Sequence, residues 1–229
     1  MHLLRLHPSL RRPGWSDLAA LAAGAVLPLA FAPLGFFPLA VLAPALLFVL
    51  WAGATPGRAA WRGFLFGLGQ FGVGVGWLYI ALHEFGDMHG FLAFAMLLLF
   101  IAFLAGYPAL LGWLQARLRA AAGRQQAPAP APGWTALTLL PALWVVLEWV
   151  RGWFLTGFPW LDLGYSQIDG PLAGYAPLLG VYGLSLVAVI SAALVMQMVC
   201  DRGRAGRYLG VLLLLWSGGW ALGQVSWVE

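Results

Sequence analysis

The sequence predicts an all-α integral membrane protein, a bundle of about seven transmembrane helices. Hydrophobic residues make up 62% of the chain and charged residues only 9%, whereas about a quarter of a soluble domain is charged. Apolar windows of about twenty residues recur along the chain, and such a window can cross a bilayer as a helix. The arginines fall in short groups between these windows, as topology determinants do. This scattering argues against nucleic-acid binding, despite the net charge of +4.

The chain begins with a basic segment, residues 1–15, which carries Arg5, Arg11 and Arg12 ahead of the first apolar window. A cleavable signal peptide begins in a similar way. However, many apolar windows follow and no small-residue cleavage site stands out. We therefore predict that residues 1–15 form a cytoplasmic tail.

Residues 16–229 form the predicted transmembrane domain. Its windows lie near residues 18–32, 36–52, 62–82, 91–114, 135–154, 176–199 and 208–225. Prolines at the end of the first window and inside the second predict two short, kinked helices with a tight turn at Pro33-Leu34-Gly35. Gly, Pro and aromatic residues follow the fifth window, which predicts a re-entrant or irregular periplasmic loop near residues 156–170.

The third window is rich in glycine at helical spacing. Small residues spaced in this way let a neighbouring helix approach closely, so we predict that this helix is central to the bundle. The glycines are Gly63, Gly67, Gly69, Gly72, Gly74 and Gly76. Residues 67–72 also fit G-x-G-x-x-G, but the dinucleotide fingerprint needs a preceding strand and a helix N-terminus. These residues lie in the middle of an apolar window, so close packing is the favoured interpretation.

The polar stretch HEFGDMH, residues 83–89, follows the third window. Its side chains suggest a metal site, but a zinc-protease helix needs a second His four residues after the first, and Asp87 stands there. We favour a polar outer loop just above the bilayer and predict no metal and no cofactor. The aromatic residues before His83 would lie in the membrane interface, where a substrate headgroup could also bind.

Glu148 and Arg151 place both signs of charge inside the fifth window. They are separated by about 4.5 Å of helical rise and share one face of the helix. An unpaired charge in hydrocarbon costs several kcal/mol, so one interpretation is a structural ion pair between these two residues near the outer interface. The other is that one of them lies on a path for a charged lipid or peptide. The residues alone leave both open.

The distribution of arginine orients the bundle. If alternate loops lie on alternate sides, eleven of the twelve arginines share one side and Arg151 is alone on the other. The positive-inside rule makes the arginine-rich side cytoplasmic. An odd number of spans then puts the C-terminus outside. The Ala/Pro run at residues 125–133 is predicted to be a short cytoplasmic linker.

No self-sufficient active site is visible in the sequence. Cys200 lies at the cytoplasmic end of the sixth window with no His nearby, and no serine lies in a G-x-S-x-G elbow. We therefore predict no catalytic residue in this chain. Two alternatives are a noncatalytic membrane scaffold and a small transporter or channel that uses Glu148 and Arg151. The transporter lacks support from an internal repeat or from a pair of matching broken helices.

Five stretches resemble one protein family in collinear order. They are FAPLGFFPLA (31–40), GFLFGLGQFGVGVGWLYIALHEFG (63–86), YPALLGWL (107–114), LEWVRGWFLTGFPWLDLGYSQ (147–167) and PLAGYAPLLGVYGLS (171–185). Over nearly its whole length the chain resembles the apolipoprotein N-acyltransferases of Gram-negative bacteria. The TGFPW and GYSQ elements are the specific ones.

The resemblance implies an enzyme of the bacterial inner membrane, an acyltransferase whose N-terminus is cytoplasmic. In that family a membrane bundle carries a periplasmic carbon-nitrogen hydrolase domain. A cysteine there takes a fatty acyl chain from a phospholipid as a thioester. It passes the chain to the diacylglyceryl-cysteine of an apolipoprotein, the last step of lipoprotein maturation. A Glu base and a Lys that stabilises the oxyanion complete the triad.

The implied partners are therefore a phospholipid donor, a diacylglyceryl apolipoprotein acceptor and the bilayer. This chain stops at Glu229, with its C-terminus predicted in the periplasm, where the hydrolase domain is expected to begin. We expect residues 1–229 alone to be catalytically incompetent, as a fragment, a truncation or a degenerate product would be.

Both implied substrates are anchored in the outer leaflet, so we predict that lipids enter the bundle sideways. The outer ends of the third and fifth windows would form the floor of the lipid site, because Trp and Tyr suit the headgroup level and Arg can bind a phosphate. The structural alternative is an ordinary aromatic belt over a packed turn. The candidate lipid-binding residues are Trp77, Tyr79, His83, Arg151, Phe158, Trp160, Tyr165 and Gln167.

Overall fold

The structure, a computed structural model, describes residues 13–121 and 133–226, and within them it is built of helices without a strand. The predicted all-α class is confirmed for this part of the chain. The α-helices are α1 (Pro13–Val26), α2 (Leu39–Trp51), α3 (Pro56–Gly74), α4 (Leu78–Ile80), α5 (Gly90–Ala121), α6 (Gly133–Arg151), α7 (Ala176–Cys200) and α8 (Ala205–Leu222). The short turns are the 3-10 helices η2 (Leu27–Ala30), η4 (Phe154–Thr156), η5 (Leu163–Gln167), η6 (Pro171–Tyr175) and η7 (Arg202–Arg204) and the π-helix η3 (Ala81–Phe85).

Each predicted window contains a helix, but the helices differ in length. Among the described residues, Gly90–Ala121 and Pro171–Cys200 are long and apolar enough to cross a membrane. A third crossing results if Pro56–Gly74 and Leu78–Phe85, which are bent by 62° to each other, form one span. The helices at the first two windows are apolar and shorter. The helical membrane fold agrees with the sequence, and the count of seven crossings stays a prediction. Most of the predicted tail, nearly all of the linker and Glu229 lie outside the described residues.

Local sequence sets the turn between α2 and α3. Gly53 adopts φ +71°, a left-handed conformation that favours glycine, just after α2 ends. Thr55 then caps α3, because its hydroxyl accepts a hydrogen bond from the backbone N–H of Arg58 at 3.4 Å. Pro56 takes the first helical position, where no backbone donor is needed.

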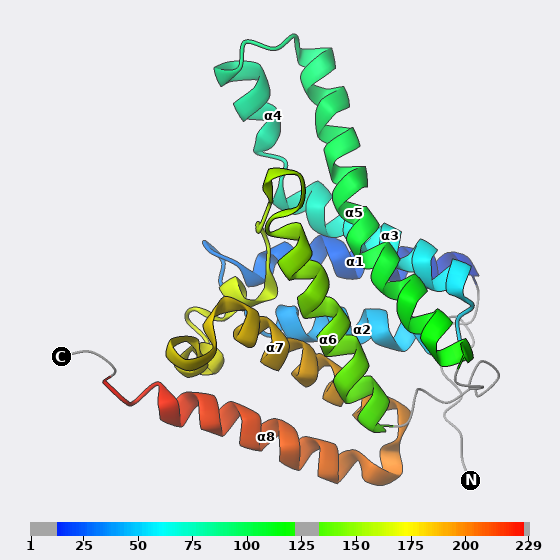
Figure 1. Cartoon of the computed structure of the whole chain (residues 1–229), viewed down its shortest axis with the longest axis vertical. Helices are drawn as coiled ribbons and strands as arrows, with labels where there is room; N and C mark the ends of the chain where they lie inside the picture. Colours follow the sequence, from blue (N-terminus) through cyan, green and yellow to red (C-terminus); the bar gives the residue numbers. More distant parts are fainter. Residues whose placement is uncertain (1–12, 122–132, 227–229) are drawn as a thin grey trace.

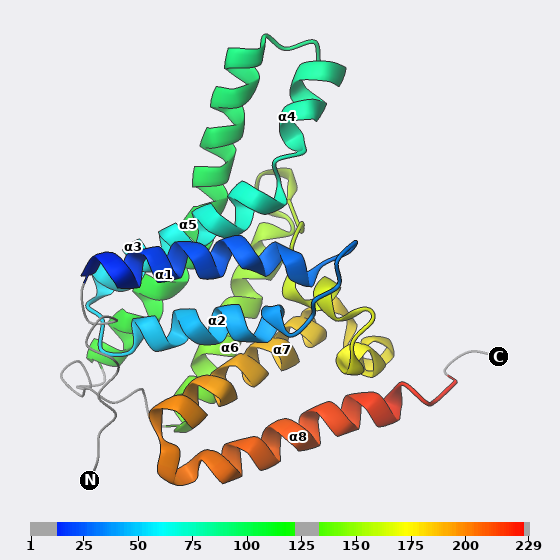
Figure 2. The same cartoon turned by 180° about the vertical axis from the view of Figure 1, so that it is seen from behind.

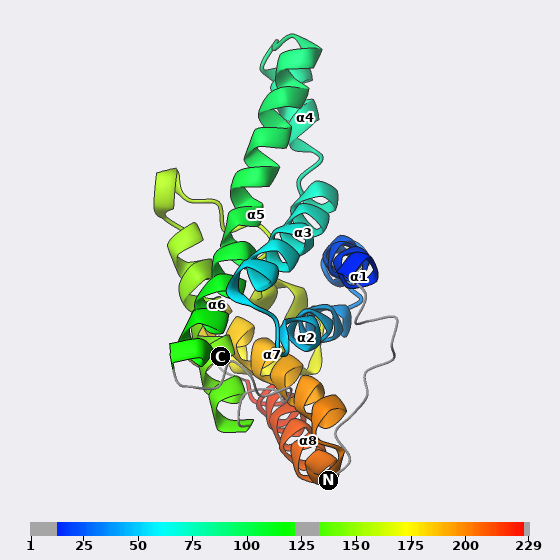
Figure 3. The same ribbon diagram turned by 90° about the vertical axis from the view of Figure 1, so that its right-hand side faces the viewer.

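The glycines of α3 let it lie between α1 and α5 (Figure 3). A Cβ added to Gly67 would lie 2.6 Å from the Cα of Ala105 in α5, and one added to Gly69 would lie 2.2 Å from the carbonyl oxygen of Leu21 in α1. Backbones this close exclude any side chain at the contact. The predicted close approach of neighbouring helices is confirmed at Gly67 and Gly69, whereas an added Cβ at Gly72 meets nothing within 4 Å. The central place of this helix stays a prediction.

Two arginines cap the C-terminus of α2. Arg62 in α3 donates a hydrogen bond to the carbonyl of Leu50, and Arg119 in α5 donates one to the carbonyl of Trp51 at 3.4 Å. The last carbonyls of a helix have no partner within the helix and carry partial negative charge. The two guanidinium groups supply both the hydrogen bonds and the opposite charge at the end of this short, buried helix.

The helices alternate in direction, so the bundle has two distinct ends (Figures 1 and 2). The starts of α1, α3, α6 and α8 lie at one end, together with the last turns of α2, α5 and α7. Arg58 and Asp17 form an ion pair there, with a distance of 2.9 Å between Nη2 and Oδ1. Arg151 ends α6 at the opposite end. Among the described residues, this arrangement separates Arg58 from Arg151.

A helical hairpin leaves the bundle next to the end of α3 (Figures 1 to 3). It consists of α4, η3 and the first part of α5, a helix of 32 residues and therefore about 48 Å long. Large apolar side chains cover it, with Phe85, Phe91 and Leu99 exposed by 85%, 78% and 66%. Surface of this kind suits hydrocarbon rather than water.

Candidate functional site

The chain between α6 and α7 folds back over the end of α6, as Figure 1 shows. The backbone N–H of Phe158 donates to the carbonyl of Arg151 at 2.8 Å. Leu155 and Leu161 adopt left-handed conformations, with φ of +50° and +64°, which are unusual for a residue with a branched side chain. The irregular loop predicted near residues 156–170 is present. Because irregular backbone near hydrocarbon needs partners for its polar groups, the side chains around it must supply them.

Arg151 is the first of these side chains. Its Nη1 donates to the carbonyl oxygen of Trp160 at 2.7 Å, and its Nη2 forms an ion pair with Asp162. The guanidinium also lies over the ring of Phe71, with its carbon 5.1 Å from the ring centre. The Arg151 side chain is 4% exposed and that of Asp162 1% exposed. One buried cation therefore holds both the backbone and a carboxylate of the loop against α3.

Glu148 supplies a hydrogen-bond acceptor for the loop. Its Oε1 accepts hydrogen bonds from the indole N–H of Trp144 at 2.8 Å and from the backbone N–H of Leu163 at 2.9 Å. One of the two interpretations of the sequence was an ion pair between Glu148 and Arg151, but the ion pair of Arg151 in the structure is with Asp162. The reason is the return of the loop, which brings a second carboxylate to the guanidinium and leaves Glu148 to accept a backbone N–H.

Asp162 lies in the loop with one oxygen lacking a hydrogen-bond partner within the described residues. Burial and the negative charge of Glu148 raise the pKa of Asp162, Arg151 opposes both effects, and the resulting pKa is about 7. Two carboxylates share one guanidinium in this cluster. A proton on Asp162 therefore relieves their repulsion at or below neutral pH.

Four of the predicted lipid-binding residues gather beside this loop. The rings of Trp77 and Trp160 lie with centroids 5.2 Å apart, and Phe158 lies 6.4 Å from Trp160. Phe100 in α5 completes the aromatic cluster at 5.0 Å from Phe158. Arg151 joins it through the hydrogen bond to the carbonyl of Trp160. Trp77 and Trp160 stay 43% and 50% exposed, so the aromatic cluster presents flat, partly open rings.

The other four candidates lie outside the aromatic cluster. Tyr79 and His83 form a ring pair at 5.4 Å within the projecting hairpin, where Nδ1 of His83 donates to the carbonyl of Met88 at 2.8 Å. Tyr165 is 46% exposed, and Gln167 is fully buried. Gln167 therefore acts inside the loop rather than at its surface. Among residues 13–121 and 133–226, no three His, Cys, Asp or Glu side chains come close enough to hold a metal ion.

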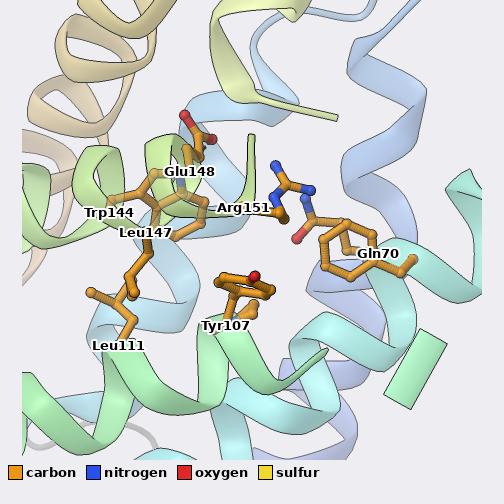
Figure 4. Close-up of a pocket in the computed structure, with 9 residues that line it drawn as sticks. Gln70, Tyr107, Leu111, Trp144, Leu147, Glu148 and Arg151 are labelled. Atoms are coloured by element: carbon orange, nitrogen blue, oxygen red, sulfur yellow. Dashed lines mark hydrogen bonds between the residues drawn. The ribbon is translucent and has the colours of Figure 1, made fainter. Parts of the chain in front are cut away.

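A pocket lies beside the Arg151 cluster, between α3, α5 and α6 (Figure 4). Its walls include Gln70, Phe71, Tyr107, Leu111, Trp144 and Leu147. The sequence analysis did not predict this pocket. Gln70 could have indicated it from the sequence, because it is the lone amide in the apolar half of α3. A polar side chain inside a membrane bundle is a functional candidate.

The family is decided by comparison with known proteins. The sequence pattern described as the apolipoprotein N-acyltransferase N-terminal domain matches residues 23–194. The chain belongs to the apolipoprotein N-acyltransferase family. The resemblance found in the five collinear stretches is thereby confirmed, and the loop, the aromatic cluster and most of the pocket lie within the matched residues.

Several relatives named apolipoprotein N-acyltransferase support the assignment. The relative from Methylococcus capsulatus is 43% identical over 93% of this chain and 40% of its own length. The one from Azotobacter vinelandii is 46% identical over 95% of this chain and 42% of its own length. The one from Coxiella burnetii is 41% identical over 93% of this chain and 43% of its own length. The chain thus spans about two-fifths of the length of the relatives it matches.

Proposed function

We propose that this chain is the membrane domain of an enzyme that moves a fatty acyl chain from a phospholipid to the N-terminal diacylglyceryl-cysteine of an apolipoprotein. The observation that carries the proposal is the match of residues 23–194 to the N-terminal domain of that family. The chemistry would take place in a separate catalytic domain through a cysteine thioester, and the bundle would place that domain and its lipids together.

We place the bundle in the inner membrane with the arginine-rich end in the cytoplasm. The positive-inside bias supports this orientation, because the ends of α2, α5 and α7 share one end of the bundle with the starts of α3 and α8 (Figure 2). The loop after α6 and the aromatic cluster would then face the periplasm. Lipids of the outer leaflet would meet them at the level of their headgroups.

Trp77, Phe158 and Trp160 are the residues that we propose to contact the lipid. The ring of Trp160 lies 5.2 Å from that of Trp77, which is distant in sequence, and 6.4 Å from that of Phe158. All three rings stay partly open, and indole rings favour the headgroup level of a bilayer. Arg151 is buried and bonded to Asp162 and the carbonyl of Trp160. We therefore give Arg151 a positioning role, which is to hold Trp160 in place. These contacts also weigh against a translocation path through Glu148 and Arg151.

A domain exchange tests the proposal. Residues 1–229 would replace the matched segment of the Azotobacter vinelandii relative, which is 46% identical over 223 residues. The measurement is N-acylation of a diacylglyceryl lipopeptide in phospholipid vesicles. We expect the chimera to transfer the acyl chain. A folded, membrane-inserted chimera without transfer, beside an active parent protein, contradicts the proposal.

The same chimera tests the aromatic cluster. Trp160→Ala removes a ring of the cluster, and Trp220→Ala in α8, where the side chain is 61% exposed, is the matched control. We expect Trp160→Ala to lower transfer at least about tenfold, the effect of losing roughly 1.4 kcal/mol of transition-state stabilisation, and Trp220→Ala to leave it unchanged. Equal activity of the two variants would show that the aromatic cluster does not contribute to acyl transfer.

A further inference from the structure

The pocket between α3, α5 and α6 reaches the surface between α5 and α6. Tyr107 of α5 and Leu147 of α6 line it and are partly exposed, whereas Leu111 and Trp144, from the same two helices, are 2% and 6% exposed. The partly exposed pair forms the mouth and the buried pair the inner wall. α5 packs mainly against α3 and only loosely against α6, which leaves the mouth open between these helices.

The pocket has a polar end that the protein does not satisfy. Gln70 is 4% exposed and lines the pocket, and in the described part of the chain its amide makes no hydrogen bond. The hydroxyl of Tyr107 has no such partner there either. Figure 4 shows both side chains facing the same space beside Arg151. A buried amide without a partner is costly, so a ligand with hydrogen-bonding atoms fits this end.

The rest of the pocket is apolar and lies deeper in the bundle. One helical turn along α5 leads from Tyr107 to Leu111, and one turn back along α6 leads from Glu148 to Trp144. Both steps run away from the loop after α6. The pocket therefore has a polar end nearer that loop, lined by Gln70, Tyr107, Glu148 and Arg151, and hydrocarbon walls at the other end, which matches an amphiphile that enters with its tail first.

We propose that this pocket binds one acyl chain of a membrane lipid, with the ester group at Gln70 and Tyr107 and the tail against Leu111 and Trp144. The inference deepens the proposed function and rests on it, since it gives the lipid a binding site inside the bundle. An ester only accepts hydrogen bonds, and the amide and hydroxyl can both donate. Arg151 is already paired with Asp162, so the site has no spare cation that would favour a free fatty acid.

Photolabelling of the 229-residue chain tests the inference without any acyl transfer. The chain is placed in phosphatidylcholine vesicles that contain a phosphatidylcholine with a diazirine on one acyl chain, either beside the ester or at the chain end. Labelled residues are found by mass spectrometry. We expect the ester-proximal probe to label Gln70 or Tyr107 and the terminal probe to label Leu111 or Trp144. Labels confined to exposed residues such as Leu110 overturn the proposal.

Two variants sharpen the experiment. Leu111→Trp fills the buried wall, and its neighbour Leu110→Trp, at a position that is 44% exposed, is the matched control. We expect inner labelling to disappear only in Leu111→Trp. Gln70→Leu replaces the amide by an apolar side chain of similar size, and loss of one hydrogen bond should lower ester-proximal labelling about fivefold while the fold is kept. Unchanged labelling in a folded Gln70→Leu chain contradicts the assignment of the polar end.

The two proposals can fail separately. If the chimera transfers acyl chains and the inner residues are never labelled, the acyl-chain pocket is refuted and the function stands. If the inner residues are labelled and the inserted chimera is inactive, the pocket stands as a lipid site and the proposed function falls.

Discussion

Arg151 at the end of α6 and Asp162 in the following loop form an ion pair whose side chains are 4% and 1% exposed. The pair is 11 residues apart in sequence, so it closes the loop onto the helix that precedes it. The same guanidinium donates to the carbonyl of Trp160. Through these two contacts one side chain fixes the segment that carries the exposed rings of the aromatic cluster.

The first prediction concerns removal of this cation. Arg151→Met keeps most of the side-chain volume but leaves Asp162 and Glu148 without a counter-charge and the carbonyl of Trp160 without a donor. Breaking a buried pair on one side costs about 3–5 kcal/mol, so we expect a destabilisation of that order. The measurement is the unfolding free energy in mixed micelles of detergent and denaturing surfactant.

Arg117→Met is the control for this change. Arg117 lies in α5 over the ring of Trp113 at 5.2 Å and is exposed. Exposed substitutions of this kind usually change stability by less than about 0.5 kcal/mol. If the two variants unfold at the same surfactant concentration, the Arg151 pair does not hold the loop.

The second prediction concerns the pH dependence of stability. The folded chain holds the pKa of Asp162 at about 7, whereas an Asp in an unfolded chain has a pKa near 3.9. Between these values the folded state keeps a proton that the unfolded state has released. Stability therefore falls as the pH rises through this window and levels off above about 7.

Asp162→Asn should weaken this decline, because the amide cannot lose a proton. Asp169→Asn, seven residues further along the loop at an exposed position, should retain it. Unfolding midpoints of the three proteins, measured between about pH 4.5 and 8, decide the matter. A decline of undiminished size in Asp162→Asn would assign the titration to another group.

The sequence predicts the helices well and the site only in outline. Hydrophobic windows locate the helices because burial in a bilayer needs long apolar segments, and the glycine spacing of α3 predicts its central place. The partner of a buried charge is harder to predict. Residues three apart on a helix share a face, but a long side chain can also reach a loop that folds back over the helix. The sequence therefore suggests Glu148 as the partner of Arg151, and the tertiary path of the loop provides Asp162. Trp144 lies four residues before Glu148 on the same face of the helix, so its indole N–H could have been predicted from the sequence as a donor to Glu148.

The third prediction concerns the close contact of α3 and α5. A Cβ at Gly63 would lie 2.2 Å from the carbonyl oxygen of Pro108, whereas at Gly72 it would meet nothing within 4 Å. Gly63→Ala should separate the helices and destabilise the bundle by about 1–3 kcal/mol. Gly72→Ala should be neutral or stabilise α3 by up to about 1 kcal/mol, since Ala is the better helix former. Equal thermal shifts of the two variants would refute the close contact.

The fourth prediction concerns the indole of Trp144. Its N–H donates to Oε1 of Glu148 at 2.8 Å, and Oε2 of Glu148 has no hydrogen-bond partner among the described residues. Trp144→Phe keeps an aromatic ring in the core but removes a donor from a buried carboxylate, a change that costs about 1–3 kcal/mol. Because Glu148 also binds the backbone of Leu163, we expect the loop to loosen before the helices unfold.

Trp149→Phe, on the same helix at a position that is 53% exposed, controls for the loss of an indole. Hydrogen exchange of the backbone N–H groups of Leu163 and Gly164 reports the loop directly, because these groups are bonded to Glu148 and Ser185. Faster exchange in Trp144→Phe than in Trp149→Phe is the expected result, because a carboxylate that loses one of two donors binds the remaining one in a less restricted position. Identical exchange in both variants would mean that Glu148 holds the loop without help from the indole.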